Sequence, residues 1–427
     1  MINIGLLGFG TVGQGVVEIL NKHQAAFKQR TGKTIQVKSV LVRNLEKAKA
    51  HPLAGTVAIT TNPGDILNDP DIHIVIEVLG GETPAKVFIT QALEAKKHVI
   101  TANKEVVSKH KSKFIALAVE NQVDFYFEAA VGGSLPIIRS LKVGYGANEI
   151  QALYGILNGT TNFMLTKIEE DQKDYADVLK QAQDLGFAEA DPTMDVSGKD
   201  AAYKLDILAA VAFKQEVGVD HIFHEGVDQL TLKDLKYAKE FGYKIKLLAQ
   251  AYRTPAGLAL KVHPTLINQD HPLASVRNEF NAVFVVGDAV GEAMIYGKGA
   301  GSLPTASAVV SDVLDVVLHN LAPSKQNLET LSAHLPLVPI GQTQSRFYLR
   351  MTIQDHPGVL EKIAHVFGQN TISISSLAQH EEPDTRAELV IITHSAAEAA
   401  FQTAVSTLKT LPDVTAIDAV IRVGLAL

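Results

Sequence analysis

The stretch INIGLLGFGTVGQG at residues 2–15 determines the architecture of the N-terminal part of the chain. It begins with a short apolar run, typical of a buried strand, and continues directly into a GxGxxG pattern at Gly8, Gly10 and Gly13. Apolar residues then recur at helical spacing as far as Leu20. In the order strand, turn, helix, the first glycine permits the tight turn, the second lets the backbone approach a pyrophosphate, and the third allows close packing of helix on strand. The stretch therefore predicts a dinucleotide-binding fold.

Four further short apolar runs follow, separated by segments with helical periodicity. They lie at Ile35–Val42, Ile72–Leu79, His98–Thr101 and Val123–Glu128. Strands that alternate with helices favour a parallel sheet covered by helices on both faces. We therefore predict an α/β Rossmann domain over residues 1–133, completed by a returning helix at residues 303–320.

The residue after the second predicted strand bears on the choice of cofactor. An NAD site usually carries Asp or Glu there to bind the ribose hydroxyls, whereas this sequence has Arg43. Because a cation suits a 2′-phosphate, we expect NADPH as the cofactor, with NADH as the alternative. An arginine on a surface loop would have no bearing on that choice.

Two later strands also end in polar residues. Lys104 closes the segment TANK (101–104), at the edge of the sheet where open α/β folds bind their ligands. Glu128 begins EAAVGGS (128–134), whose carboxylate and glycine turn fit either a monovalent cation or a tight loop. Taken by themselves, these residues favour the tight loop.

The segment with most polar side chains is AEADPTMDVSGKDAAYKL at residues 188–205. Asp200 and Lys204 are four residues apart and share one face of a helix predicted to begin near Ser197. Because apolar residues surround this pair on the helix, the polar residues indicate a site for a small zwitterion, with carboxylates for its ammonium and a lysine as proton donor. A structural ion pair is the alternative.

The C-terminal residues follow a different plan. Strand and helix signals from 347 to 423 come in the order β-α-β-β-α-β, which is the ferredoxin-like arrangement. We predict a linker at 321–345 and a regulatory domain at 346–427. Residues 134–302 are then expected to form an α+β domain for catalysis and oligomerisation.

Composition excludes several classes of protein. The 427 residues carry 39 Lys and Arg against 46 Asp and Glu, and this net charge of −7 gives no general attraction to nucleic acid. There is no cysteine, so a disulfide framework, a thiolate zinc site and a thiohemiacetal intermediate are excluded. No apolar run suits a membrane span and the first residues do not resemble a signal peptide, so we expect a cytoplasmic protein.

Six segments resemble the signature blocks of homoserine dehydrogenases. They are GFGTVGQG (8–15), TANK (101–104), EAAVGGSLPII (128–138), GILNGTTNF (155–163), AEADPTMDVSGKDAAYKL (188–205) and GAGSLPTASAV (299–309). The tail resembles an ACT domain through YLR (348–350), DHPGVL (355–360), ISIS (372–375) and Gln379. The resemblance implies reversible NAD(P)H-dependent reduction of L-aspartate 4-semialdehyde to L-homoserine, in threonine and methionine biosynthesis. It also implies threonine as an effector at the ACT domain. We expect a homodimer or homotetramer, because an ACT-type module exposes sheet edges.

The resemblance assigns roles to individual residues. Lys204 matches the family's proton-donor lysine, Lys104 matches the second lysine of the site, and Asp200 completes the catalytic set. The implied substrate contacts are Glu189, Asp195, Asp200 and Thr160. The implied cofactor contacts, to which Arg43 adds, are Gly8, Phe9, Gly10, Thr11, Val12, Gly13, Lys104 and Gly301. The implied sodium ligands are Glu128, Val131, Gly133 and Leu135, and this match outweighs the preference for a tight loop.

Two other functions remain open from the sequence. One is a different Rossmann oxidoreductase acting on an amino acid, such as an aspartate dehydrogenase. The other is a non-catalytic NAD(P)-dependent sensor whose output is amino-acid binding in the C-terminal module. Lys104, Asp200 and Lys204 distinguish the enzyme from the sensor, because a sensor needs no proton donor. Since cysteine chemistry is excluded, direct hydride transfer to the aldehyde is the route that we expect.

Overall fold

The computed structural model describes residues 1–324, 331 and 333–425. Residues 325–330 and 332 of the predicted linker, and residues 426–427 of the predicted regulatory domain, lie outside this range. The chain forms two compact units, each made of three separate segments. The first unit comprises Met1–Ile150, Tyr203–Val219 and Gly287–His334, and the second comprises Gln151–Ala202, Asp220–Val286 and Leu335–Leu427. This division into two units does not test the domain boundaries expected from the sequence, which stay a prediction.

A six-stranded sheet organises the first unit, with strand order β3-β2-β1-β4-β5-β6 and every described pair parallel. The strands are β1 (Ile2–Leu7), β2 (Ile35–Leu41), β3 (Ala58–Thr60), β4 (Ile72–Glu77), β5 (His98–Thr101) and β6 (Phe125–Tyr126). The chain reverses its direction of travel across the sheet between β1 and β4, which is where doubly wound folds bind ligands. The Rossmann prediction is confirmed.

Two strands of this sheet differ from the sequence-based expectation. The predicted strand Val123–Glu128 is reduced to β6, because Glu128–Ala130 forms a turn of 3₁₀-helix. The predicted strand Ile72–Leu79 ends at Glu77, so its last two residues belong to a loop. Strand β3 was not predicted, since its residues are only partly buried and form no apolar run.

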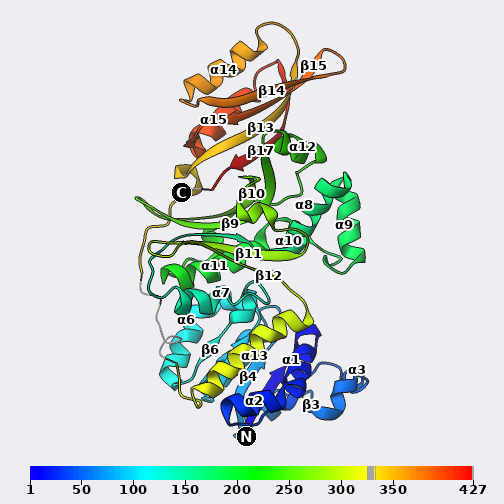
Figure 1. Cartoon of the computed structure of the whole chain (residues 1–427), viewed down its shortest axis with the longest axis vertical. Helices are drawn as coiled ribbons and strands as arrows, with labels where there is room; N and C mark the ends of the chain where they lie inside the picture. The colour runs from blue at the N-terminus through cyan, green and yellow to red at the C-terminus, as the bar shows by residue number, and fades with distance from the viewer. Residues whose placement is uncertain (325–330, 332, 426–427) are drawn as a thin grey trace. The chain divides into compact units, whose positions relative to one another are not determined.

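Helices cover this sheet. They are α1 (Thr11–Lys22), α2 (Gln24–Thr31), α3 (Leu45–Lys49), α4 (Gly64–Leu67), α5 (Ala85–Glu94), α6 (Lys104–Asn121) and α7 (Ile137–Arg139). The returning helix forms as α13 (Ser302–Leu318) and lies beside α1, as Figure 1 shows. Its buried face includes Ala306, Val309 and Val313, which join the core formed by β1 and α1.

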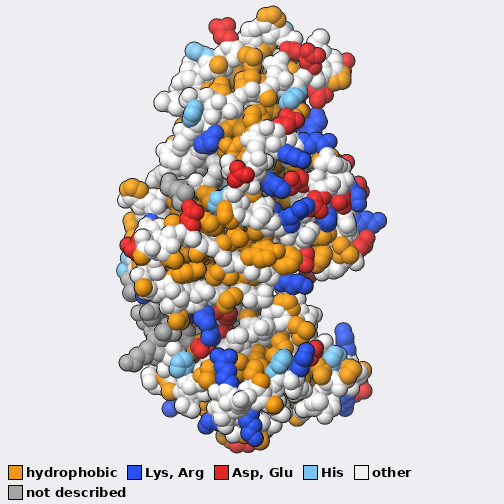
Figure 2. All heavy atoms as spheres, in the orientation of Figure 1, with side chains coloured by type: hydrophobic (Ala, Val, Ile, Leu, Met, Phe, Trp, Pro, Cys, Tyr) orange, Lys and Arg blue, Asp and Glu red, His pale blue; other side chains and the backbone are white. Residues whose placement is uncertain are grey.

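Strand β12 (Gly291–Lys298), also in the first unit, carries large hydrophobic side chains in solvent. Met294 is 36% exposed and Tyr296 is 51% exposed, and Val290 just before the strand is 42% exposed. Hydrophobic side chains gather over this strand in Figure 2. Contiguous apolar surface of this kind commonly marks an interface.

The second unit contains a mixed sheet in the order β11-β7-β9-β10-β17-β13-β15-β14. Its earlier strands are β7 (Ile150–Ile156), β8 (Phe223–His224), β9 (Tyr243–Thr254), β10 (Gly257–Asn268) and β11 (Phe280–Gly287). Its helices include α8 (Gly159–Asp171), α9 (Tyr175–Asp184), α10 (Thr193–Val196) and α12 (Leu232–Glu240). Helix α11 (Lys199–Phe213) begins two residues after the predicted start at Ser197, and its residues from Tyr203 onward belong to the first unit.

The C-terminal part of the second unit has the predicted β-α-β-β-α-β order. Its elements are β13 (Gln344–Gln354), α14 (Val359–Gln369), β14 (Ile374–Glu382), β15 (Arg386–Thr393), the short β16 (Ala396–Ala397), α15 (Glu398–Leu408) and β17 (Val414–Val423). Strand β14 begins within the ISIS segment (372–375), whose residues 372–375 are expected to form a strand of this plan, and continues to Glu382. Its outer residues alternate between exposed and half-buried positions, so no apolar run reveals it. The ferredoxin-like plan is confirmed.

No helix among the described residues is both long enough and apolar enough to cross a membrane.

Candidate active site

The glycine turn after β1 has surroundings that explain two of its three glycines. Gly8 has a φ of 111°, which favours glycine, and a Cβ there would lie 2.9 Å from the carbonyl oxygen of Val78. A Cβ on Gly13 would collide with the carbonyl oxygen of Gly8. A Cβ on Gly10 would meet nothing within 4 Å, so the backbone at this position faces open space. A phosphate can therefore approach Gly10 at the start of α1.

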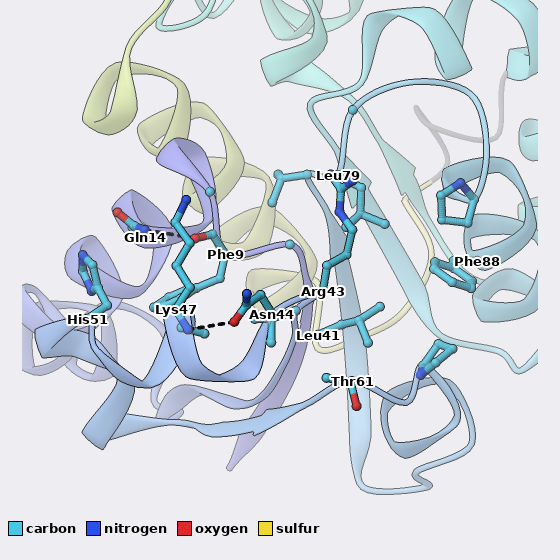
Figure 3. A pocket seen from close by; sticks show the side chains of 18 of the residues that line it. Phe9, Gln14, Leu41, Arg43, Asn44, Lys47, His51, Thr61, Leu79 and Phe88 are labelled. Carbon is cyan, nitrogen blue, oxygen red and sulfur yellow. Dashed lines mark hydrogen bonds between the residues drawn. The ribbon is translucent and has the colours of Figure 1, made fainter.

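A cavity of about 970 Å³ opens beside this turn. Figure 3 shows Leu41 and Leu79 among the side chains that line it. Its walls come from the carboxyl ends of β1, β2 and β4, through residues such as Gly8, Leu41 and Val78. This is the switch point of the sheet, and both the cavity and the glycine turn fit a nicotinamide dinucleotide. Four of the predicted cofactor residues line the cavity: Gly8, Phe9, Gly10 and Arg43.

The other predicted cofactor residues also belong to the first unit, but they do not line this cavity. Thr11, Val12 and Gly13 form the first turn of α1, and Lys104 is the first residue of α6. Gly301 precedes α13 with a φ of 122°, and the hydroxyl of Ser302 donates to the carbonyl oxygen of Thr11 over 2.7 Å. The loop at Gly301 is therefore anchored to the start of α1.

Two cations follow β2 at the cavity. Arg43 and Lys47 are both exposed cavity residues, and Figure 3 shows their side chains extending from the segment after β2. Asn44 holds this segment in place, because its side-chain oxygen accepts from the N–H of Lys47 over 2.9 Å and so caps α3. Lys47 was not predicted from the sequence. The signal that could have found it is the capping asparagine three residues before it.

The loop predicted to bind sodium is tightly constrained. Glu128 is buried, and its two carboxylate oxygens accept from the N–H groups of Ile138, over 2.7 Å, and Arg139, over 2.8 Å. Burial raises the pKa of Glu128, while these two hydrogen bonds act in the opposite direction. A Cβ on Gly133 would lie 2.5 Å from the carbonyl oxygen of Gly299, so the glycine turn is also required by packing.

The donor set of this loop is one carboxylate together with backbone carbonyls, which suits a hard cation. The predicted ligands Glu128, Val131, Gly133 and Leu135 lie within one stretch of eight residues, which begins with the 3₁₀-helix Glu128–Ala130. Within the described part of the chain, no group of three or more His, Cys, Asp or Glu side chains could hold a metal ion.

In the second unit, Asn158 brings together two of the predicted substrate carboxylates. Its amide nitrogen donates to Asp195 Oδ1 over 2.7 Å and to Asp200 Oδ2 over 2.8 Å. Its amide oxygen accepts from the N–H of Thr161 over 2.8 Å and so caps α8. Asp200 is 2% exposed and Asp195 is half-buried. One amide therefore holds two carboxylates close together at the end of β7.

Thr160 and Glu189 lie on neighbouring segments of the same unit. The hydroxyl of Thr160 donates to the carbonyl oxygen of Phe187 over 2.6 Å, and Gln183 donates to the carbonyl oxygen of Glu189 over 3.1 Å. The side chain of Glu189 is exposed. These bonds fix the loop that carries Glu189 against the start of α8. Lys204 is half-buried and lies on α11, four residues after Asp200, in the part of that helix that belongs to the first unit.

The sequence pattern did not single out Asn158, although this residue organises the carboxylates. It lies between an apolar strand and a helix, where asparagine is a common cap, so its position alone gives no sign of a binding site. The capping role accounts for the amide oxygen. The two hydrogen bonds donated by the amide nitrogen are additional to it.

Comparisons with known proteins agree over nearly the whole chain. Family models match for homoserine dehydrogenase at residues 136–314, for the homoserine dehydrogenase NAD-binding domain at residues 8–128, and for the ACT domain at residues 347–413. The homoserine dehydrogenase of Bacillus subtilis (strain 168) is 42% identical, covering 99% of this chain and 98% of its own. That of Synechocystis sp. is 43% identical, covering 99% of both chains.

Solved structures show the same relationship. The crystal structure of a homoserine dehydrogenase from Thiobacillus denitrificans has a TM-score of 0.94 and 42% identity, covering 99% of this chain and 98% of that one. A hyperthermophilic archaeal homoserine dehydrogenase in complex with NADPH has a TM-score of 0.64 and 25% identity, covering 74% of this chain and 98% of that one. The resemblance inferred from the sequence is confirmed: the chain belongs to the homoserine dehydrogenases, a family of NAD(P)-dependent oxidoreductases, and carries a C-terminal ACT domain.

Proposed function

We propose that the chain catalyses the reversible reduction of L-aspartate 4-semialdehyde to L-homoserine with NADPH. The nicotinamide supplies the hydride when it is bound. The protein must then bind the amino acid, supply one proton and stabilise the oxyanion that develops on the former aldehyde oxygen.

The observation that carries this proposal is the pair of hydrogen bonds from Asn158 to Asp195 and Asp200. Two carboxylates fixed on one amide form a site for the substrate's ammonium group, because the amide prevents them from moving apart. Thr160 and Glu189 border the same segment and complete the proposed substrate contacts.

Lys204 is the proposed proton donor, and Lys104 is the proposed second cation that stabilises the oxyanion. Both are half-buried, so their ammonium charges are less screened than those of surface lysines. A helix holds each lysine: Lys104 is the first residue of α6 and Lys204 lies within α11. Asp200, one helical turn before Lys204, belongs to the proposed catalytic set.

NADPH is the proposed cofactor, in preference to NADH. Arg43 and Lys47 both line the cavity just after β2, where the 2′-phosphate of NADPH is bound in Rossmann folds. Two cations at this position favour the 2′-phosphate of NADPH, whereas the ribose hydroxyl of NADH is usually bound by a carboxylate.

A sodium ion is proposed at the loop of Glu128, Val131, Gly133 and Leu135. The carboxylate and the backbone carbonyls of this turn support a hard monovalent cation. The test is to replace Na⁺ by choline at constant ionic strength. We expect lower thermal stability as well as lower activity without Na⁺, and equal values in the two salts would exclude the site.

Threonine is the proposed effector of the ACT domain, and a homodimer or homotetramer is the proposed assembly. Gln379 donates to Asp355 over 3.0 Å, which joins two of the segments that resemble ACT domains. The exposed apolar side chains around β12 support burial against a second copy of the chain. Inhibition by threonine and the mass in solution test these two proposals separately.

The direct test of the function is homoserine-dependent reduction of NADP⁺, followed at the nicotinamide absorbance. We expect reduction with L-homoserine and none with L-aspartate. Reduction with L-aspartate would instead identify an aspartate dehydrogenase. NADPH binding without turnover of either substrate would favour a sensor.

A further inference from the structure

Glu77 is a fully buried carboxylate beside the cofactor cavity, and none of the roles above uses it. It is the last residue of β4 and its exposed fraction is 0%. Its Oε1 accepts from the N–H of Leu79 over 2.7 Å, and its Oε2 accepts from the hydroxyl of Thr101 over 2.6 Å. Glu77 and Thr101 are partners in the parallel pairing of β4 with β5, so each stands at the carboxyl end of its strand.

The hydrogen bonds continue from Thr101 into a closed ring. The oxygen of Thr101 also accepts from the N–H of Asn103 over 3.0 Å. The side-chain amide of Asn103 donates to the carbonyl oxygen of Gly81 over 2.6 Å, which returns the ring to the loop after β4. Glu77 therefore ties the loop at 78–81 to the segment between β5 and α6.

Both of these loops belong to the proposed cofactor and catalytic machinery. Val78, Leu79 and Gly80 line the cavity. Asn103 caps α6 by accepting from the N–H of Val106 over 3.3 Å, and the first residue of that helix is Lys104. The ring thus sets the position of the cavity wall and the start of the helix that carries Lys104.

Stability alone is a poor reason for a carboxylate at this position. Burying an ionised group is costly, and well-packed apolar residues usually replace buried charges at little or no loss of stability. Burial raises the pKa of Glu77, whereas the hydrogen bonds from Thr101 and Leu79 oppose that rise. The bonds that stabilise the charge are the same ones that hold the two loops.

We propose that Glu77 is a positioning residue which, through Thr101 and Asn103, holds Lys104 and the loop at 78–81 in the geometry needed for hydride transfer. This inference rests on the proposed function. Glu77 is not expected to contact either substrate, but the alignment of Lys104 depends on it.

The test uses Thr101→Val, which removes the hydroxyl with little change in side-chain shape. This variant leaves Glu77 Oε2 without the Thr101 donor and the N–H of Asn103 without the Thr101 acceptor. We expect kcat to fall by about 10²-fold, because a small misplacement of a reacting group is costly. The deuterium isotope effect on kcat should rise, since hydride transfer becomes rate-limiting. The KM for homoserine should change little.

Two matched controls accompany this variant. Thr101→Ser keeps the hydroxyl and should restore kcat and the isotope effect to values near those of the unmodified protein. Thr60→Val, at the end of β3 in the same sheet, removes a hydroxyl that donates to Asp65 over 2.6 Å, away from Lys104. It should leave kcat and the isotope effect unchanged.

The proposal is overturned if Thr101→Val matches Thr101→Ser in kcat. It is also overturned if kcat falls only in proportion to the folded fraction, with an unchanged isotope effect. If the unmodified protein does not reduce NADP⁺ with homoserine, the proposed function fails, and the NADPH affinity then tests the ring. In that case we expect Thr101→Val, but not Thr101→Ser, to bind NADPH more weakly, and equal affinities would overturn the role of Glu77.

Discussion

The cofactor cavity of the first unit and the carboxylate cluster of the second are built in different ways. The cavity is built around a local backbone feature, the glycine turn, to which the ends of three parallel strands and two cations on a capped loop are added. The cluster is formed by side chains, with Asn158 joining Asp195 and Asp200. A backbone site depends on spacing along the chain, whereas a side-chain site depends on residues that the fold brings together.

The largest effect is expected from Lys204→Ala, on the helix that also carries Asp200 of the cluster. Without its proton donor the reaction should lose about 10²- to 10⁴-fold in kcat. Steady-state rates of NADP⁺ reduction with homoserine measure this loss. Lys199→Ala is the matched control, because Lys199 is exposed at the start of the same helix and should retain its activity. A kcat for Lys204→Ala close to that of the control would remove Lys204 from the mechanism.

The second effect comes from Asn158→Ser, which keeps a capping oxygen for α8 but removes the amide donors to Asp195 and Asp200. Hydrogen bonds to charged groups are worth about 1.5–3 kcal/mol, so we expect the KM for homoserine to rise by about 10- to 100-fold. Asn44→Ser makes the same exchange at the cap of α3 in the cofactor region. It should leave that KM unchanged, and a comparable increase in both variants would argue against a specific role of Asn158.

The third effect is on cofactor preference. Arg43→Asp places a carboxylate where a ribose hydroxyl could bind it and where a 2′-phosphate would be repelled. We expect the ratio of kcat/KM for NADPH over NADH to fall by about 10-fold or more. Lys49→Asp, at the end of the short helix α3 that follows Arg43 but outside the cavity lining, is the control. If this kcat/KM ratio is unchanged in Arg43→Asp, Arg43 does not determine the preference for NADPH.

The smallest effect concerns stability beneath the substrate region. Lys246 is buried, donates to Asn162 of α8 over 3.0 Å, and has a pKa lowered by burial to about 8. The unfolded chain keeps this proton up to a higher pH than the folded protein does. Between pH 8 and 10 the free energy of unfolding should therefore increase as the pH rises. The gain, relative to Lys246→Met, should reach about 2 kcal/mol in urea unfolding. If the free energy of unfolding depended on pH in the same way in the unmodified protein and in Lys246→Met, burial would not destabilise the ammonium of Lys246.

Spacing and periodicity were sufficient for the Rossmann and ferredoxin-like plans and for the glycine turn. They were insufficient for Asn158, because the residues that it joins are 37 and 42 positions away in the sequence. They also gave no sign of Glu77, since one acidic residue at the end of an apolar run carries no local mark of complete burial. Strand β3 was missed for the opposite reason, because its residues remain partly exposed.

The central claim is that cofactor and substrate are recognised by two separately built sites. The most direct measurement is a titration of NADPH into Asn158→Ser and Arg43→Asp side by side, followed by nicotinamide fluorescence. We predict that Asn158→Ser binds NADPH as tightly as the unmodified protein and that Arg43→Asp binds it more weakly. Equal weakening in the two variants would contradict the claim.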